Sequence, residues 1–215
     1  MIQVQTFTFN RFEENTYILS DHTKECIIID PGCYDRKEKE ALRQFIANQS
    51  FIVKLLLNTH CHLDHVVGNY FIKTTYKVPL LMHQLEVETL RAAQAYAPMY
   101  GFPAYEPTDA DQFVSEKDTI TFGASSLQIL FVPGHSIGHL AFYSKEDGFC
   151  INGDVLFRGS VGRTDLPNGN MDTLMNSIFT KMYALPDETL VYCGHGQTTT
   201  IGHEKKYNPF CAVSV

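Results

Sequence analysis

The 215-residue sequence contains no tryptophan, no long apolar run and no excess of basic side chains. A helix that spans a bilayer needs about 20 consecutive apolar residues, whereas the longest apolar run here, 51–57, is interrupted by Lys54. The N-terminus also lacks the positively charged start and the apolar stretch of a secretory signal peptide. We therefore expect a cytoplasmic protein with no membrane partner.

Acidic side chains outnumber basic ones, with 24 Asp and Glu against 17 Lys and Arg, and the formal net charge is −7. Broad binding to nucleic acid or to an anionic membrane needs a positive surface, so neither partner is expected. A small anionic ligand held by one or two local basic groups is compatible with this balance. The content of 44% hydrophobic and 19% charged residues is typical of a folded globular chain.

Cysteine is present but forms no C-x-x-C pair. The spacing of the six cysteines indicates neither a disulfide framework nor a thiolate zinc site. Reduced thiols in a cytosolic protein are the simpler interpretation. The cysteines are at positions 26, 33, 61, 150, 193 and 211.

The order of elements in the first part of the chain indicates an α/β fold. Alternating or β-branched segments predict strands at 2–9, 16–19 and 26–29, and a buried strand at 52–57. Between the last two lies an amphipathic segment, 35–49, that predicts a helix.

The remaining pattern continues without a linker, a repeat or a low-complexity segment, so we expect one domain over residues 1–215. A helix is expected to begin near His65 and to carry Phe71 and Ile72, and Leu190–Cys193 is expected to be the last strand, followed by a short polar tail. Further strands are expected at 78–82, 119–122, 127–132, 140–143 and 149–152, further helices at 83–97 and 171–184, and a loop or lid at 98–107.

The most informative motif is THCHLDH, residues 59–65, which follows the predicted buried strand. A chance match to H-x-H-x-D-H in a chain of this composition has a probability of roughly one in a thousand. His60 and His62 are two residues apart on an extended segment, so both imidazoles point to the same side, and Asp64 continues that parity. With His65 they offer nitrogen and carboxylate ligands suited to Zn²⁺, iron or manganese. A surface histidine cluster or a helix cap is the competing interpretation.

Three more candidate ligands each follow a predicted strand and lie beside a glycine: His135, Asp154 and His195. Taken singly, each is more often a turn residue than a ligand. Together with the first motif, they predict that side chains from separate strand ends converge on one metal centre.

The segments THCHLDH, PGHS, NGDVLF and CGHG, in this order, resemble the metallo-β-lactamase superfamily. FRGSVGRTDLPNG and GHGQTTTIGHEKKYNPF resemble more narrowly its type II glyoxalase (hydroxyacylglutathione hydrolase) branch, especially the short bacterial members. The resemblance implies an α/β, four-layer αββα sandwich. It also implies that residues 1–215 form the hydrolase domain, without the C-terminal helical domain with which larger glyoxalases bind glutathione.

The same resemblance implies two divalent metal ions, with zinc expected and iron or manganese as alternatives. Asp64 and Asp154 are the catalytic residues that it implies. Zinc β-lactamases proper usually carry cysteine in place of Asp154, so aspartate there, together with His65, argues against a true β-lactamase. The ligands that it implies are His60, His62 and His135 for the first metal, Asp64, His65 and His195 for the second, and Asp154 as the bridge.

The activity that the resemblance implies is hydrolysis of an acyl-glutathione-type thioester, such as S-lactoylglutathione, by a metal-bound hydroxide. A basic residue on the loop after Asp154 contacts glutathione in this branch, which makes Arg163 the first and Arg158 the second candidate. Asp165 stands where the family has an aromatic partner. The aromatic segment 96–105 is an alternative candidate for one side of the substrate site, and a packed aromatic cap is the competing interpretation.

Three other functions remain open. One is hydrolysis of a lactone or of another thioester. The second is an iron-dependent persulfide dioxygenase, which needs only one metal held by two histidines and an aspartate, so the seven-ligand set argues against it. The third is a metal-binding or sensing protein without enzymatic activity. The pattern predicts neither the oligomeric state nor the natural acyl group.

Overall fold

The computed structural model describes residues 1–213, and its contacts divide the chain into two compact units. Unit 1 comprises residues 1–114 and 121–126, and unit 2 comprises residues 115–120 and the described residues from Leu127 onward. Each unit contains helices and the larger part of one six-stranded sheet. Within residues 1–213, no helix is long and apolar enough to cross a membrane.

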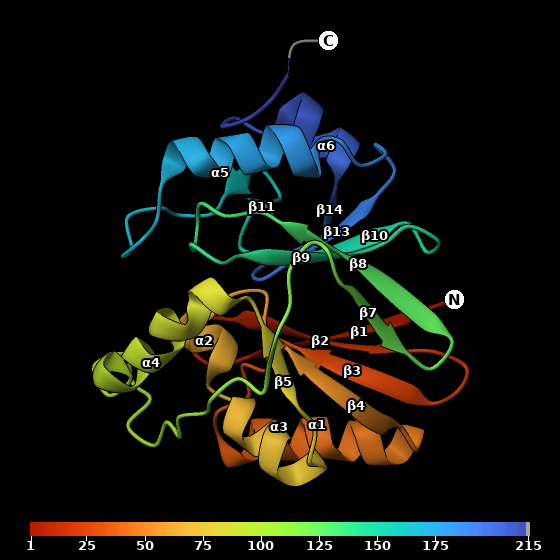
Figure 1. Cartoon of the computed structure of the whole chain (residues 1–215), viewed down its shortest axis with the longest axis vertical. Helices are drawn as coiled ribbons and strands as arrows, with labels where there is room; N and C mark the ends of the chain where they lie inside the picture. Colours follow the sequence, from red (N-terminus) through yellow and green to blue (C-terminus); the bar gives the residue numbers. More distant parts are fainter. Residues whose placement is uncertain (214–215) are drawn as a thin grey trace. The chain divides into compact units, whose positions relative to one another are not determined.

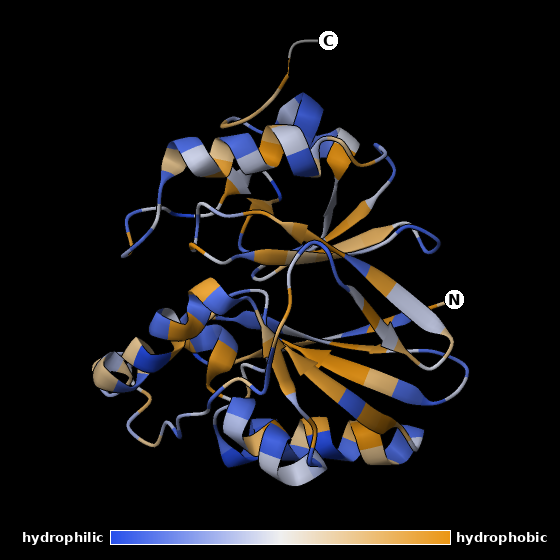
Figure 2. Cartoon of the chain, viewed as in Figure 1, coloured by the Kyte–Doolittle hydropathy of each residue, from blue (hydrophilic) through white to orange (hydrophobic). Residues whose placement is uncertain are grey.

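The sheet of unit 1 has the strand order β1-β2-β3-β4-β5-β6. Its first three strands are antiparallel neighbours, and the pairs from β3 to β6 are parallel. Figure 2 shows the middle strands of this sheet as largely hydrophobic, as expected for strands that are covered on both faces. The strands are β1 Gln3–Phe9, β2 Glu14–Ser20, β3 Glu25–Ile29, β4 Ile52–Leu57, β5 Leu80–Met82 and β6 Gln112–Phe113.

Helix α1 of unit 1, Arg36–Gln49, lies with α3 along one face of that sheet (Figure 1). It begins with a capping box in which Asp35 and Glu38 satisfy each other's backbone amides, and it buries Leu42 and Ile46 against the sheet. The other helices of unit 1 are α2 Leu63–Val66, α3 Asn69–Tyr76, η1 Gln84–Glu86 and α4 Val87–Tyr96.

One predicted helix of unit 1 is in fact two. The helix expected from His65 is divided into α2 and α3 at Gly68, whose amide donates to the carbonyl of Pro31 at 2.8 Å. A Cβ at Gly68 would lie 2.5 Å from that carbonyl oxygen, so only glycine allows this close approach. The break leaves α2 as a short element that carries the metal motif.

The sheet of unit 2 has the strand order β14-β13-β10-β9-β8-β7, with a separate β11–β12 hairpin. The strands from β8 to β10 are antiparallel, and β10 pairs with β13 in parallel. The bounds are β7 Thr119–Phe122, β8 Ser125–Phe131, β9 Leu140–Ser144, β10 Phe149–Gly153, β11 Leu156–Phe157, β12 Ser160–Val161, β13 Leu190–Cys193 and β14 Thr199–Thr200.

Helices α5 and α6 lie together on one side of the unit 2 strands (Figure 1). Helix α5, Met171–Ser177, continues as a π-helical turn, Ile178–Met182, and together they account for most of the helix predicted at 171–184.

The end of the chain corrects a prediction. Leu190–Cys193 is not the last strand and no simple tail follows it, because β14 and α6, Ile201–Tyr207, come after it. Much of the buried face of α6 is polar, which is why a hydrophobic pattern did not reveal it. Glu204 is fully buried and accepts hydrogen bonds from Gly159 N at 2.9 Å and from Asn208 Nδ2 at 2.7 Å.

The α/β architecture predicted from the element order is confirmed by both sheets and their helices. The assignment of one domain to residues 1–215 stays a prediction.

Candidate metal centre

The THCHLDH motif of unit 1 begins directly after β4, and its last residues form α2. The buried strand β4 ends at Leu57, the chain bends at Thr59, and His62, which has an extended backbone, directly precedes α2. The imidazole of His60 is centred 4.7 Å from that of His62 and 4.2 Å from that of His65. His60 and His65 have no exposed surface. Three histidines of the motif therefore form one cluster, most of which is buried.

Asp30, at the end of β3, orients this cluster. Its Oδ1 accepts from the amide of Thr59 at 2.7 Å, and its Oδ2 accepts from the Thr59 hydroxyl at 2.5 Å. The same Oδ2 lies 3.2 Å from Nδ1 of His65. A carboxylate can only accept hydrogen bonds, so Nδ1 of His65 carries the proton and its Nε2 keeps a lone pair. That lone pair is the form of imidazole that binds a metal.

The same carboxylate also acts on His60 through Thr59. The Thr59 hydroxyl donates its one proton to Asp30, so it acts as the acceptor for His60 Nδ1, which lies 3.0 Å away. Nδ1 of His60 is therefore protonated as well, and Nε2 of His60 has the lone pair. One buried aspartate thus fixes the tautomers of His60 and His65.

Asp64 lies on the first turn of α2, and its Oδ2 is 3.9 Å from Nε2 of His65. Asn10, on the β1–β2 hairpin, holds the local backbone by donating to the carbonyl of Asp64 at 3.0 Å and to that of Gly32 at 3.1 Å. Glu14 is buried nearby, with Oε1 3.8 Å from His65 Nδ1. Burial is the main cause that raises the pKa of Glu14 well above its ordinary value.

Unit 2 brings the other three predicted ligands together around one carboxylate oxygen. Oδ2 of Asp154 lies 3.5 Å from Nε2 of His135 and 3.6 Å from Nε2 of His195. Nδ1 of His135 lies 2.7 Å from the carbonyl of Arg163, which can only accept, so Nε2 of His135 has the lone pair. Two imidazoles therefore converge on the same oxygen.

The backbone places Asp154 at the end of β10, directly after Gly153. Gly153 has a φ of +52°, a conformation that glycine adopts without strain. The amide of Asp154 donates to Nε2 of the buried His139 at 3.1 Å, and Nδ1 of His139 in turn lies 3.0 Å from the carbonyl of Leu140. His139 is therefore a neutral imidazole that fixes the backbone of Asp154 rather than a member of the ligand set.

The donor sets of both units suit divalent metal ions. Unit 1 presents the Nε2 lone pairs of His60 and His65, whose rings are oriented by Asp30, and unit 2 presents two imidazoles on one carboxylate. The second nitrogen of three of these imidazoles has a hydrogen-bond acceptor, as is usual for metal-binding histidines. The chain therefore carries His-rich candidate sites whose chemistry fits divalent metals.

The two arginines predicted to bind substrate have partners within unit 2. Arg163 donates from Nε and Nη2 to both oxygens of Asp165, at 2.6 and 2.7 Å, and this ion pair lowers the pKa of Asp165 to about 2. Arg158 donates from Nη1 to Oε1 of Gln197 at 3.2 Å. The side chain of Arg163 is 62% exposed, so solvent and ligands still reach it.

The six cysteines are all buried, consistent with reduced, packed thiols. Burial raises the pKa of Cys61, and it raises the pKa of Cys193 to about 12. A thiol with a raised pKa is a poor nucleophile and a poor metal ligand at neutral pH.

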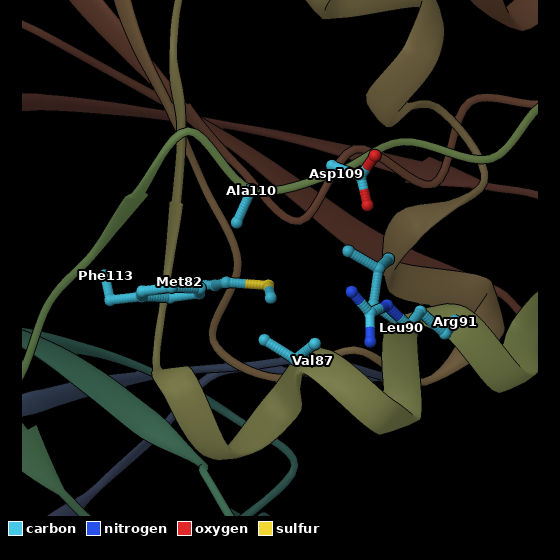
Figure 3. Close-up of a pocket in the computed structure, with 7 residues that line it drawn as sticks. All are labelled: Met82, Val87, Leu90, Arg91, Asp109, Ala110 and Phe113. Carbon is cyan, nitrogen blue, oxygen red and sulfur yellow. The ribbon is translucent and has the colours of Figure 1, made fainter.

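A cavity of about 290 Å³ lies elsewhere in unit 1, between β5, α4 and the segment that leads to β6 (Figure 3). None of the predicted metal ligands or substrate contacts lines it. Its walls are mostly apolar, with one cationic and one anionic side chain. The lining residues are Met82, Val87, Leu90, Arg91, Asp109, Ala110 and Phe113.

Three residues that hold the ligand segments were not predicted from the sequence: Asp30, Glu86 and His139. Glu86 is fully buried and accepts from the amide of Cys61, between the first two histidines, at 2.9 Å. Asp30 could have been predicted from the sequence, because it directly follows a buried strand, as Asp154 does. No sequence pattern of this kind pointed to Glu86 or His139.

Known proteins resemble this chain over most of its length. A family model described as the metallo-beta-lactamase superfamily matches residues 10–195. The hydroxyacylglutathione hydrolase GloC of Haemophilus influenzae is 35% identical over 97% of this chain and 98% of its own. A probable metallo-hydrolase of Bacillus subtilis is 35% identical over 90% of both chains.

Two solved structures resemble the chain closely. The B3 metallo-beta-lactamase BLEG-1 is 32% identical, with a TM-score of 0.88 over 98% of this chain and 99% of that one. TTHA1623 in a di-iron-bound form is 35% identical, with a TM-score of 0.85 over 96% of this chain and 100% of that one. The predicted fold class, the metallo-β-lactamase fold, is confirmed by this likeness.

Proposed function

This chain belongs to the metallo-β-lactamase superfamily and is a metal-dependent hydrolase, and we propose that it cleaves an acyl-glutathione-type thioester such as S-lactoylglutathione. The likeness to the H. influenzae hydroxyacylglutathione hydrolase supports this substrate class, because it extends over nearly the whole of both chains. The sequence motifs that follow Asp154 and His195 point to the same branch.

The proposed centre holds two divalent ions. Zinc is the first candidate because of the imidazole and carboxylate donors, and iron is supported by the di-iron form of a relative; manganese is also compatible. The proposed ligands are His60, His62 and His135 for one ion, Asp64, His65 and His195 for the other, and Asp154 for both.

The observation that carries this proposal is the position of Asp154. Its Oδ2 lies at similar distances, 3.5 and 3.6 Å, from the Nε2 atoms of His135 and His195. These histidines are proposed ligands of different ions, so a carboxylate between them is suited to bridge the pair. A bridge of this kind holds two cations together by neutralising part of their repulsion.

Bound ions would supply Lewis acidity that polarises a carbonyl and lowers the pKa of water toward about 7. The protein's own contribution is to hold the donors in place and in the right protonation state. Asp30 keeps the Nδ1 proton on His65 and, through Thr59, on His60, so that both Nε2 atoms are available. In this proposal Asp64 and Asp154 are the catalytic carboxylates, which orient the attacking water toward the thioester carbonyl.

A thiolate is a good leaving group, because the pKa of a thiol is only about 8.5, and it needs little acid assistance. The reaction therefore requires no nucleophilic side chain. This agrees with the raised pKa of Cys61 and Cys193, which makes both thiols unreactive.

Arg163 is the proposed contact for a carboxylate of the thiol carrier, with Arg158 as a second candidate. A guanidinium binds a carboxylate in a bidentate manner, as Arg163 already does with Asp165. A substrate carboxylate would therefore compete with Asp165 for Arg163.

β-Lactam hydrolysis is the second candidate function, because the B3 metallo-beta-lactamase BLEG-1 is 32% identical over nearly the whole chain. An amide ring is also cleaved by attack of water on a carbonyl. The acyl-glutathione proposal has the support of a curated relative of slightly higher identity.

Metal-free protein reconstituted separately with zinc, iron and manganese tests the proposal. Turnover of S-lactoylglutathione should exceed that of a lactone and of a β-lactam, and bound metal should reach two ions per chain. A chelator should abolish activity and lower the melting temperature, because metal binding is linked to folding. Preferred turnover of the β-lactam would refute the substrate proposal, and a metal content that never exceeds one would refute the two-ion centre.

The proposed location is the cytoplasm, supported by six buried cysteines that form no disulfide. The proposed partner is the small thioester alone, in keeping with a net charge that disfavours nucleic acid and anionic membranes.

A further inference from the structure

Arg11 stands out among the six arginines of the chain. Three of the others donate to carboxylates of Glu40, Glu88 and Asp165, and Arg158 donates to Gln197. Arg11 lies at the tip of the β1–β2 hairpin, is exposed, and makes no hydrogen bond or ion pair within residues 1–213. Arg36, at the start of α1, is the other arginine that makes no hydrogen bond or ion pair within the described residues.

Arg11 is nevertheless held in place by packing. Its side chain lies over Gly101, where an added Cβ would be 3.3 Å from Cδ of Arg11 and would collide with Nη1. Gly101 also has a φ of +89°, which disfavours any other residue. The guanidinium is thus packed against the loop after α4 while its hydrogen-bond donors remain available.

Two exposed aromatic residues are neighbours of this arginine, since Phe12 follows it in the chain and Tyr100 precedes Gly101. Phe12 is 40% and Tyr100 48% exposed, and their ring centroids are 6.3 Å apart. Both rest on further aromatic rings, since Phe12 lies 5.8 Å from the buried Phe102 and Tyr100 lies 5.8 Å from Tyr96. Large exposed rings next to a cation are suited to bind a ligand that has both apolar atoms and a negative charge.

Two contacts connect these residues to the metal motif within unit 1. Asn10, next to Arg11, donates to the carbonyl of Asp64 at 3.0 Å. Tyr96, on which Tyr100 rests, is the last residue of α4. Helix α4 also packs against α2. The aromatic residues are therefore adjacent to a proposed metal ligand.

We propose that Arg11 binds a carboxylate of the thiol carrier, with Phe12 and Tyr100 packing against the carrier's apolar atoms. The inference rests on the proposed thioester hydrolysis and adds a specificity-determining residue to it. A carrier such as glutathione has two carboxylates, so a contact with Arg11 is compatible with a separate one to Arg163. The guanidinium offers paired donors in the planar arrangement that a carboxylate accepts.

Such a contact is made equally in the bound substrate and in the transition state, so it affects KM rather than kcat. Removal of a charge-assisted hydrogen bond at an exposed site should raise KM by about tenfold. The effect should depend on the carboxylates of the substrate and not on its acyl group.

The test compares Arg11→Ala and Arg11→Lys with the wild type and with Arg43→Ala as a matched control. Arg43 is an exposed arginine on α1 that pairs with Glu40. The substrates are S-lactoylglutathione, its diethyl ester, which keeps the skeleton but lacks the carboxylates, and the coenzyme A thioester, which carries phosphates. Melting temperatures are measured for every variant.

For S-lactoylglutathione, Arg11→Ala should raise KM about tenfold with little change in kcat. Arg11→Lys should restore part of the affinity, Arg43→Ala should resemble the wild type, and the diester should show no penalty. Equal losses on acid and diester would show a structural role and overturn the proposal, as would an unchanged KM. A penalty confined to the coenzyme A thioester would also overturn it, in favour of phosphate recognition.

Failure of the proposed function would look different. In that case the wild type turns over none of these thioesters, and the inference is tested by direct binding of S-methylglutathione to the metal-loaded protein. Weaker binding to Arg11→Ala than to the wild type and Arg43→Ala would support the contact, and equal binding would refute it.

Discussion

The two units supply metal-ligand candidates in different ways. Unit 1 gives four from one short segment, 60–65, and anchors two of them on the single carboxylate of Asp30. Unit 2 gives three from the ends of separate strands, and two of them have separate supports. Nδ1 of His135 is fixed by the carbonyl of Arg163, and the backbone of Asp154 by His139.

Burial is complete for the two ligand candidates that share the Asp30 anchor. His60 and His65 in unit 1 have no exposed surface, whereas the side chains of Asp154 and His195 in unit 2 are 11% and 26% exposed. A compact segment can be buried with one shared anchor, because its ligands are fixed relative to one another by the local backbone. Ligands from separate strands depend on the whole sheet for their relative positions. A change at one anchor should therefore affect several ligands in unit 1 and only one in unit 2.

Asp154→Asn is expected to have the largest effect, because it removes the charge at the oxygen on which His135 and His195 converge. Activity should fall by at least about 10²-fold, the scale on which electrostatic changes in metal sites act. The exposed Asp172→Asn is the matched control. Turnover close to that of the wild type at full metal occupancy would exclude Asp154 from the bridge.

Asp30→Asn tests the shared anchor of unit 1. Asparagine tolerates the φ of +49° at this position, so the backbone should be retained. Loss of the anchoring charge should weaken metal binding about 10- to 100-fold, as measured by metal titration. His139→Gln, which affects only the backbone of Asp154, should weaken binding less. Equal effects of the two substitutions would contradict the contrast between the units.

Asp21→Asn tests the stability of unit 1 separately from its metal chemistry. Asp21 follows the last residue of β2, whereas Glu14, which lies near His65, is the first residue of that strand. Burial alone would raise the pKa of Asp21, but hydrogen bonds from Thr23, Ala124 and Ser125 outweigh it and lower the pKa. The ionised form therefore contributes stability above the unfolded pKa of about 3.9, and the contribution is lost as pH falls below that value.

Urea unfolding of metal-free protein measures this effect. The variant should be less stable than the wild type by about 1–2 kcal/mol at pH 7, and the difference should shrink below about pH 4. A difference that is independent of pH would show that the charge of Asp21 contributes nothing.

The smallest expected effect is that of Asp165→Asn in unit 2. An exposed ion pair is weak because solvent screens it, so release of Arg163 from Asp165 should lower KM for S-lactoylglutathione by no more than about fivefold. Arg163→Ala should raise KM instead, with kcat nearly unchanged. If both substitutions leave KM unchanged, Arg163 does not contact the substrate.

Local patterns predicted most of the fold. Strands β1 to β5 of unit 1 and helix α1 were predictable because alternation, an apolar face and an Asp35 cap are properties of neighbouring residues, whereas the two-residue strand β6 was not predicted. The division at Gly68 was not, because the close approach to Pro31 involves residues far apart in the sequence. Helix α6 was missed because its buried Glu204 and Asn208 are polar, and only their tertiary hydrogen bonds make burial favourable.

The sequence by itself determined the chemistry of the candidate site, because seven histidines and aspartates in recognisable motifs have few other uses. Only the tertiary structure decided how those side chains are held. Asp30 fixes two tautomers, Arg163 offers a backbone carbonyl to His135 as well as its side chain to Asp165, and Arg11 packs over Gly101. Each of these contacts joins distant parts of the chain or depends on the path of the backbone. A linear pattern records which groups are available, and folding determines which of them meet.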